Sequence, residues 1–481
     1  MDTRSGEFVE TEVSGIRTLH LPAPGCTRLT LHVGAGWADE SFVTRGMTHA
    51  IEHLVMGSAE PGRLESNACV TPFQTAFWAN GPADRVGPFL TQVAAALREP
   101  PLDRLDRERH VLEAETRGHT YGAHEVLLKS RFGNAGPGLG MFPGLGSQGL
   151  EPDVVARHHA QWFVSGNAVL TVVGPMPDDL DVSLPPGEAP SRTFTSWRGG
   201  PAWDRADVGD PCASIEGHDA PAASLAIRAT AGALERRLRH ELGIVYGVVP
   251  DLIRLPGSGR VVLQLTTRAA PRAEAQVAHA LIEELEHRAE VGVTADELAE
   301  DLAWSDALAD DLDTAASHLQ LQAERLLAGQ PALQVADARA RVAAVTPEEV
   351  TTQLRESLPS AMLLVPRDCK APQGLPLVPT CAAVPAFTTP RLRRRLRSGL
   401  PAGVELGFAR DLVQYRDEDG DVHEVRFDEC VGVGVAGGGR LLFGRRGCFV
   451  WVDPREFRGA EEVVRAIDEH VPPCLRFTLA G

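Results

Sequence analysis

Two histidines and a glutamate stand together in the stretch His49-Ala50-Ile51-Glu52-His53. On a helix, residues four apart lie on one face, one turn above the other, so His49 and His53 can present both imidazoles to a single ion. Glu52 projects near the same face, where its carboxylate could take a proton from a water beside that ion. The stretch therefore predicts a metal site that activates water. A helix with two surface histidines and no metal is the other interpretation.

The motif places Glu directly before the second His, which reverses the commoner His-Glu-x-x-His and is the signature of the inverted zinc peptidases. The surrounding sequence closely resembles the pitrilysin/insulinase family of zinc peptidases, which includes mitochondrial processing peptidase. The segments that carry this resemblance are Gly34–Glu40, Arg45–Met47, Asn67-Ala68, Gln74–Phe77, Glu108–Glu115 and Asn167–Gly174. The resemblance covers about residues 10–367 and implies two α/β domains of the family type.

The resemblance also implies that Glu115 is the third zinc ligand and that Glu108 supports a ligand without touching the metal. These two residues are seven apart, which places them two helical turns apart on one face. Glu113 is the nearest rival ligand, but it breaks that spacing. Without the family context, a solvated helix face would be the simpler interpretation of these carboxylates. We expect one zinc ion per chain, although a His/His/Glu site also accepts Mn or Co.

A second segment, Leu238–Tyr246, resembles a substrate-binding motif that the family carries in a later domain. It implies that Arg239 holds a substrate carbonyl and that Tyr246 donates to the developing oxyanion. On their own, these residues would be a capped helix end and a buried strand tyrosine. Asn67 and Ala68, with the β-prone segment after them, are expected to form an edge strand that receives an extended peptide by backbone pairing.

Together these residues predict a zinc-dependent endopeptidase with Glu52 as its general base. Its substrates would be peptides or unfolded segments, because family members enclose substrate between two halves of a clamshell. Leader-peptide removal or other precursor processing is one such role. The alternative is a non-catalytic scaffold or binding subunit, like the family's degenerate partners, which usually lose the His, Glu or Arg/Tyr residues that this chain keeps.

The expected oligomeric state follows from the same resemblance. Family members build their chamber from four α/β domains, whereas this chain supplies two. We therefore expect a homodimer in which Tyr246 of one subunit completes the zinc site of the other. A heterodimer with a family partner is the second arrangement.

Hydrophobic periodicity places the elements that must hold these residues. Apolar residues recur at helical spacing from Met47 to Val55 and predict a helix over residues 46–57. In the first block we expect strands at 16–21, 27–35, 71–78 and 168–174, helices at 86–98, 102–117 and 152–163, and a loop at 135–151. In the second block we expect helices at 221–241, 271–290 and 294–328, and strands at 261–267 and 361–367.

Two blocks of similar size and element order indicate a duplicated α+β unit, and the family resemblance implies that its sheets are mostly antiparallel. The predicted division is a zinc-binding domain at 1–190, a second domain at 195–370, a linker at 371–398 and a small β-rich domain at 399–481. The last part has short alternating strands and a helix at 460–470, and it resembles a pleckstrin-homology-like domain.

Composition narrows the function classes and the compartment. A net charge of -18 over 481 residues makes the chain a poor candidate for wrapping nucleic acid. Its only lysines are Lys129 and Lys370, and this bias toward Arg is typical of a GC-rich bacterial genome.

Eight scattered cysteines without Cys-x-x-Cys spacing fit a reducing compartment. The N-terminus is unlike a signal peptide and no long apolar run is present, so we expect a cytoplasmic protein without a membrane span.

Overall fold

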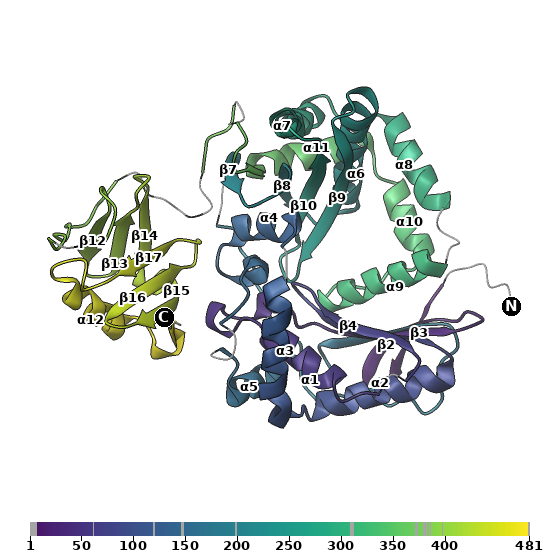
Figure 1. Ribbon diagram of the computed structural model, residues 1–481. Helices are drawn as coiled ribbons and strands as arrows, with labels where there is room; N and C mark the ends of the chain where they lie inside the picture. The colour runs from purple at the N-terminus through teal and green to yellow at the C-terminus, as the bar shows by residue number, and fades with distance from the viewer. Residues whose placement is uncertain are drawn as a thin grey trace.

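Four β-sheets, two of them large, organise the described part of the chain (Figure 1). The computed structural model describes residues 7–60, 62–118, 121–145, 149–197, 200–307, 312–370, 374–378, 381, 384, 386–396 and 398–479. Several positions of the predicted linker 371–398 therefore lie outside the described residues: 371–373, 379–380, 382–383, 385 and 397. The predicted α+β class is confirmed, because most strand pairs are antiparallel and helices cover the large sheets.

The first large sheet carries the elements around the predicted metal site. Its strands lie in the order β1 (Val9–Val13), β2 (Ile16–Leu21), β6 (Ala168–Val173), β3 (Thr27–Val33), β5 (Thr75–Gly81) and β4 (Glu65–Val70). Only the β2–β6 pair among them is parallel. Helices α1 (Met47–Met56) and α2 (Ala83–Arg98) bury their apolar sides against this sheet in one hydrophobic core.

The strand expected at 71–78 is wrong in its first half. Thr71 opens a turn in which its backbone N–H donates to Gln74 O at 2.8 Å. Strand β5 begins only at Thr75. Pro72 has no N–H to give to a strand ladder, which favours a turn at this point. The segment before the turn, β4, pairs with β5 and forms the edge of the sheet.

The second large sheet repeats the plan of the first. Its strands lie in the order β7 (Ala202–Ala206), β11 (Met362–Pro366), β8 (Cys212–His218), β10 (Arg260–Ala269) and β9 (Val245–Leu255). Counted along the chain, this order is first, fifth, second, fourth, third, and the first sheet has the same order once β1 is set aside. In both sheets the first and fifth strands are parallel. The duplicated unit expected from the element order is thus present as a shared topology.

Further helices cover the large sheets. Residues 274–290 form α7, Pro347–Ser357 form α11, and Pro221–Glu235 form α6, all packed in the core of the second sheet. Two long predicted helices are divided in the structure. Within 221–241, α6 ends at Glu235 and the chain continues as a π-type turn. The range 294–328 contains two helices, α8 (Ala295–Ala307) and α9 (Leu312–Leu327). The other α-helices described before the C-terminal part are α3 (Leu105–Gly118), α4 (Ala123–Phe132), α5 (Pro152–Trp162) and α10 (Val335–Ala343).

Two helices cross from one half to the other. α4 belongs to the first half in sequence, yet its Val126 and Leu127 join a buried cluster with β7, β8 and β11 of the second sheet. α9 does the reverse, since its Leu319 and Ala323 join a buried cluster with β2 and β6. Each is the fourth helix of its half. Figure 1 shows α4 beside β8 and β10, and α9 along the sheet that holds β2 and β3.

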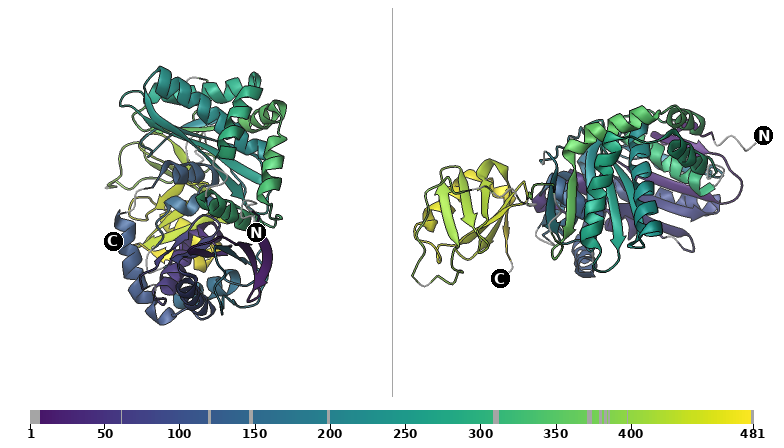
Figure 2. Two further views of the ribbon diagram at one scale, coloured as in Figure 1. Left: turned by 90° about the vertical axis from the view of Figure 1, so that its right-hand side faces the viewer. Right: turned by 90° about the horizontal axis from the view of Figure 1, so that it is seen from above.

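The C-terminal part folds into a small β-rich unit, which confirms that element of the prediction. One sheet contains β12 (Glu405–Ala409), β13 (Leu412–Arg416) and β14 (Val422–Arg426), and the other β17 (Phe449–Val452), β16 (Gly439–Gly444), β15 (Cys430–Ala436) and β18 (Arg476–Thr478). Helix α12 (Ala460–His470) packs its Val463 and Ile467 into the core of this unit. Figure 2 shows the unit as a lobe at one end of the molecule.

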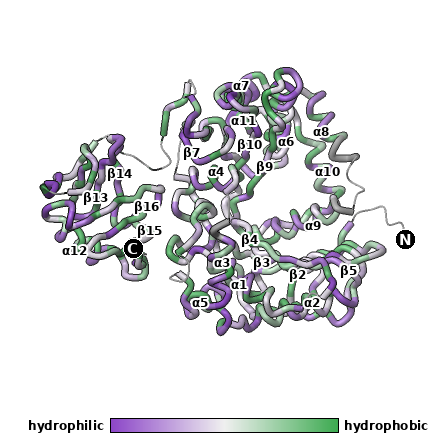
Figure 3. The backbone as a smooth tube through the Cα atoms, viewed as in Figure 1, coloured by the Kyte–Doolittle hydropathy of each residue, from purple (hydrophilic) through white to green (hydrophobic). Residues whose placement is uncertain are grey.

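Hydrophobic and hydrophilic residues alternate along the helices rather than forming one long apolar element (Figure 3). Within the described residues, no helix is both long and apolar enough to cross a membrane.

Candidate metal centre

Helix α1 presents the histidine motif away from its buried side. Ile51, Leu54 and Val55 are fully or almost fully buried in the core of the first sheet. Helical periodicity then turns His49 and His53 to the opposite side, toward α3. The helix follows Gly46, whose φ of 104° lies in the left-handed region that suits glycine. The glycine turn before α1 and the apolar side of the helix therefore decide where the imidazoles point.

Three predicted ligand atoms form a nearly regular triangle. His49 Nε2 and His53 Nε2 are 3.2 Å apart. Glu115 Oε2 lies 3.6 Å from the first and 3.4 Å from the second. Zinc bonds of about 2.0–2.1 Å to nitrogen and oxygen put tetrahedral ligand atoms roughly 3.3 Å apart. The triangle thus has the size of one face of a tetrahedral zinc site, and the donor set of two imidazoles and a carboxylate suits that ion.

Two further carboxylates flank the triangle. Glu108 Oε2 lies 3.5 Å from His53 Nδ1, the ring nitrogen turned away from the other ligands. A carboxylate in that place orients a ligating histidine and raises its basicity. Glu52 Oε2 lies 3.8 Å from His49 Nε2. Burial, followed by the negative charge of Glu115, raises the pKa of Glu52 to about 7, which suits a group that accepts and returns protons near neutral pH.

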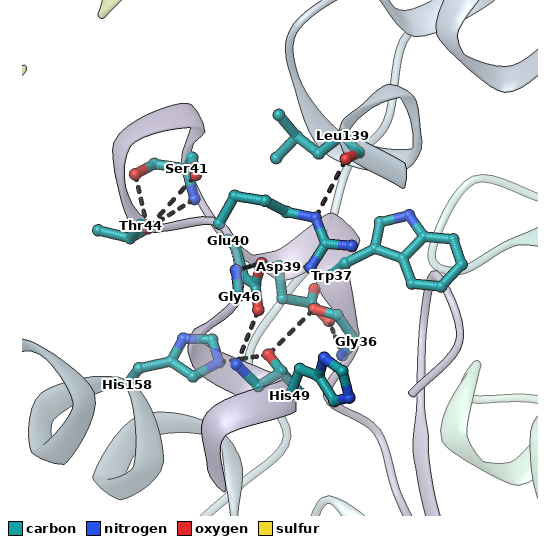
Figure 4. A network of polar contacts seen from close by, with 12 residues as sticks. Gly36, Trp37, Asp39, Glu40, Ser41, Thr44, Gly46, His49, Leu139 and His158 are labelled. Carbon is teal, nitrogen blue, oxygen red and sulfur yellow. Dashed lines mark hydrogen bonds and ion pairs between the residues drawn. The ribbon is translucent and has the colours of Figure 1, made fainter. Parts of the chain in front are cut away.

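Glu40 holds the start of α1 and was not assigned a role from the sequence. Its carboxylate accepts hydrogen bonds from the backbone N–H groups of Gly46 at 2.8 Å and Thr48 at 2.7 Å (Figure 4). It also lies 3.3 Å from Arg45 Nη1 and is only 8% exposed. A buried anion at a helix N-terminus satisfies unpaired N–H groups and interacts favourably with the helix dipole. Glu40 therefore fixes the entry of the helix that carries His49.

Replacement of Glu40 by glutamine is expected to lower the thermal unfolding midpoint, because the neutral amide loses the charge-assisted hydrogen bonds to α1. The expected decrease in the free energy of unfolding is about 1–3 kcal/mol. Differential scanning calorimetry would measure the midpoint, with Glu65→Gln as the control, since Glu65 is an exposed carboxylate that accepts one hydrogen bond from Asn80 Nδ2. Equal midpoints for the two variants would contradict the capping role.

A cleft of about 860 Å³ opens over the candidate metal centre. Its lining includes His49 and Glu52 and, from the edge strand β4 and the turn after it, Ala68, Cys69, Val70 and Thr71. Asn67 precedes them on β4 and is exposed. The expected edge strand at Asn67 and Ala68 is thus beside the three ligand atoms, where an extended chain could pair with it.

The loop that starts at Gly36 closes one end of the cleft. Trp37 lines it, and the backbone N–H groups of Trp37 and Ala38 donate to Thr71 O and Pro72 O at 3.2 and 2.9 Å. A side chain at Gly36 would place its Cβ only 2.4 Å from each of those carbonyl oxygens. The backbone approach therefore requires glycine at this position.

Part of the predicted loop 135–151 is helical. Gly136–Met141 forms a 3-10 helix that packs on the loop of Trp37, whose indole Nε1 donates to Pro137 O at 3.3 Å. The glycines of this segment let it pack closely on Trp37, since a Cβ at Gly140 would lie 3.2 Å from the indole ring. They therefore do not mark an irregular loop here.

The structure does not bring Arg239 and Tyr246 into this cleft. Tyr246 lies on the edge strand β9 and is 72% exposed, so it is not the buried strand tyrosine of the simpler interpretation. Arg239 lies in the π-type turn after α6, with its guanidinium 5.6 Å from the Tyr246 ring centre and 2.7 Å from Glu235 Oε1. The two residues are thus neighbours on the second half, apart from the cleft residues of the first.

Tyr121 is a further cleft residue for which the sequence offered no signal. It lines the same cleft as His49 and Glu52, and burial raises the pKa of its hydroxyl. It follows α3 but belongs to no motif with a recognisable spacing, and only the fold brings it to this place.

Comparison with known proteins was made on sequence and on structure. No family model and no curated protein matches the sequence. The inactive domain of a peptidase M16 from Pseudomonas fluorescens matches in structure with a TM-score of 0.62 and 16% identity, over 76% of this chain and 99% of that one. A protease from Helicobacter pylori matches with a TM-score of 0.60 and 15% identity, over 75% and 99%. Pitrilysin matches with a TM-score of 0.58 and 17% identity.

This chain has the pitrilysin-type M16 peptidase fold. The fold expected from the resemblance is therefore confirmed. The match covers 73% of this chain but only 44% of the pitrilysin chain, so the matched part spans less than half the length of that chain. The M16 fold occurs both in proteases and in a domain described as inactive, so it does not decide whether this chain cleaves peptides.

Proposed function

We propose that this chain is a zinc-dependent endopeptidase that hydrolyses peptides or unfolded segments bound in an extended conformation. The observation that carries the proposal is the triangle of His49 Nε2, His53 Nε2 and Glu115 Oε2, whose sides of 3.2–3.6 Å fit one zinc ion. Precursor or leader-peptide processing is the role in which such an enzyme would act. A fold shared with proteases supports the reaction class.

In this proposal the residues of the candidate site have distinct tasks. Bound zinc would supply Lewis-acid polarisation of the scissile carbonyl and would lower the pKa of a water to about 7. Glu52 accepts the proton of the attacking water and passes it to the leaving amine. Glu108 keeps His53 in the orientation that ligates the metal. Strand β4, at Asn67 and Ala68, aligns the substrate by backbone hydrogen bonds and excludes water from one side of it.

We further propose that Arg239 and Tyr246 act on the zinc site of a second copy of the chain. Both lie on the second half, near the exposed apolar side chains Leu242 and Val249. Exposed apolar residues next to an edge strand are suited to burial in a partner. A homodimer would then join one subunit's triangle to the other's Tyr246, which donates to the developing oxyanion. A heterodimer with a related chain would serve the same purpose.

The compartment and the domain division belong to the same proposal. All eight cysteines are free thiols, which fits the predicted reducing cytoplasm.

We keep the boundaries 1–190, 195–370 and 399–481 for the three units, with the segment 371–398 as the linker before the last one. A separate hydrophobic core lies in each of the three units.

Zinc affinity tests the assignment of the carboxylates. Glu108→Gln should weaken zinc binding roughly 10–100-fold, the cost of losing an outer carboxylate, and Glu115→Gln should weaken it more, because a direct ligand is lost. Glu113→Gln serves as the matched control, since Glu113 lines the same cleft on the same helix. Competition with a chromophoric chelator would measure the affinities. A larger loss for Glu113→Gln than for Glu115→Gln would reassign the third ligand.

A scaffold or binding subunit is the alternative function, and an inactive M16 domain with the same fold gives it a precedent. Cleavage of a mixed-sequence fluorogenic peptide library by the wild-type chain separates the two. Zinc bound at His49, His53 and Glu115 without cleavage of the library or of unfolded proteins would favour the scaffold.

A further inference from the structure

A second group of side chains that could ligate a metal lies where the C-terminal unit joins the rest of the chain. Cys381, His423 and Cys448 each turn one ligand atom toward the others, and all three atoms lie within 4.8 Å of one another. Cys381 Sγ is 3.0 Å from His423 Nδ1. Zinc bonds of about 2.3 Å to sulfur and about 2.0–2.1 Å to nitrogen place tetrahedral ligand atoms roughly 3.5–3.8 Å apart. The ion would therefore fit with movements of about one ångström.

The histidine of this cluster is oriented as a metal ligand would be. His423 Nε2 lies 3.0 Å from Asp417 Oδ2, while the other carboxylate oxygen of Asp417 accepts the backbone N–H of Asp421 at 2.9 Å. The carboxylate is thus fixed by a tight turn, and it favours the proton on Nε2. That tautomer leaves the lone pair of Nδ1 directed at the two sulfur atoms.

The three residues come from separate elements that the fold brings together. His423 lies on β14, Cys448 directly precedes β17 and is only 1% exposed, and Cys381 lies on the connecting segment. Before Cys381, the chain pairs with β7, since Val378 N–H donates to Trp203 O at 3.0 Å. After it, Val384 N–H donates to Val422 O at 2.8 Å beside β14. The cluster therefore marks the step from the second large sheet to the C-terminal unit.

We propose that Cys381, His423 and Cys448, with a water in the fourth position, bind a zinc ion that holds the connecting segment to the C-terminal unit. Two thiolates and one neutral imidazole are a soft donor set that selects zinc over Mg or Ca, and the two thiolates neutralise the charge of the ion. This ion is separate from the one proposed at His49, His53 and Glu115, and the inference does not depend on peptidase activity.

The test isolates this cluster by removing the first site. The full-length chain with His49→Ala and His53→Ala, purified without chelators under reducing conditions, should retain one zinc ion per chain by elemental analysis. After exchange with Co²⁺, it should show the thiolate-to-cobalt charge-transfer absorption that a His/His/Glu site cannot produce. Cys381→Ser with Cys448→Ser in that background should remove both the metal and the absorption. Cys26→Ser with Cys474→Ser is the matched control, since both of these cysteines are exposed and outside the cluster.

The orienting carboxylate gives a second readout that does not remove a ligand. Asp417→Asn should weaken zinc binding in the same background roughly 10–100-fold. Absence of zinc from the His49/His53 variant, with no uptake of Zn²⁺ or Co²⁺ by its reduced form, would overturn the proposal. Detection by mass spectrometry of a Cys381–Cys448 disulfide after treatment with reductant and zinc would also overturn the proposal, because the two cysteines would then form a covalent link. Both outcomes would leave the proposed peptidase site untouched.

Discussion

Replacing Glu52 with glutamine is expected to lower peptide cleavage by about 10²–10⁴-fold while the zinc content stays at the wild-type level. The amide keeps the size of the carboxylate but cannot accept the proton of the attacking water. Zinc should remain, since the triangle of His49, His53 and Glu115 does not include Glu52. Metal analysis and cleavage of the fluorogenic library by the same preparations would measure both effects.

Glu113→Gln is again the matched control for this experiment, because it makes the same chemical change in the same cleft. Its cleavage rate should stay near that of the wild type. Glu52→Gln with full zinc and full cleavage would remove Glu52 as the general base. Loss of zinc from Glu52→Gln would instead show that its carboxylate helps to hold the metal.

Mixing two inactive variants should restore activity if the catalytic site is shared between copies. One variant carries Glu52→Gln and the other carries Arg239→Ala with Tyr246→Phe. In a mixed dimer, Glu52 of one subunit meets Arg239 and Tyr246 of the other, so one of its two sites is intact. Random exchange of equal amounts makes half of the dimers mixed, which predicts about a quarter of the wild-type activity.

Each variant alone should be nearly inactive, and dilution below the dimer dissociation constant should abolish the recovered activity. A monomer by analytical ultracentrifugation that cleaves at full rate would contradict the shared site. Activity of the Arg239/Tyr246 double variant equal to wild type would show that these residues have no part in the reaction. In that case Tyr121, which lies in the cleft of the same subunit, becomes the tyrosine to examine.

Helical spacing alone predicts that His49, Glu52 and His53 lie on one side of α1, and the structure has them there. The family resemblance was needed for Glu115, which is distant along the chain but completes the triangle. The fold class and the duplicated order of elements followed from hydrophobic periodicity. The strand at 71–78 failed because its apolar and β-prone residues hide a turn at Pro72 that periodicity does not detect.

Residues that act through long-range contacts escaped prediction. Glu40 caps a helix that begins several residues later, and the bond depends on the path of the intervening loop. Helix α4 was not predicted, because Lys129 and Arg131 interrupt its apolar pattern. Arg131 is nevertheless buried, since its guanidinium donates to Ser214 O at 2.6 Å and to Ser360 O at 2.9 Å in the second half. A charged residue satisfied from another part of the chain cannot be recognised from its own segment.

The reciprocal placement of α4 and α9 has a consequence for how the chain holds together. Each large sheet is covered on one side by a helix that the other half contributes. Neither half alone would have a complete apolar interior, and each would expose the surface that the missing helix covers. The two halves should therefore lose structure together in one cooperative transition. A chain cleaved between them would remain a tight non-covalent complex, held by the two crossed helices rather than by the peptide bond.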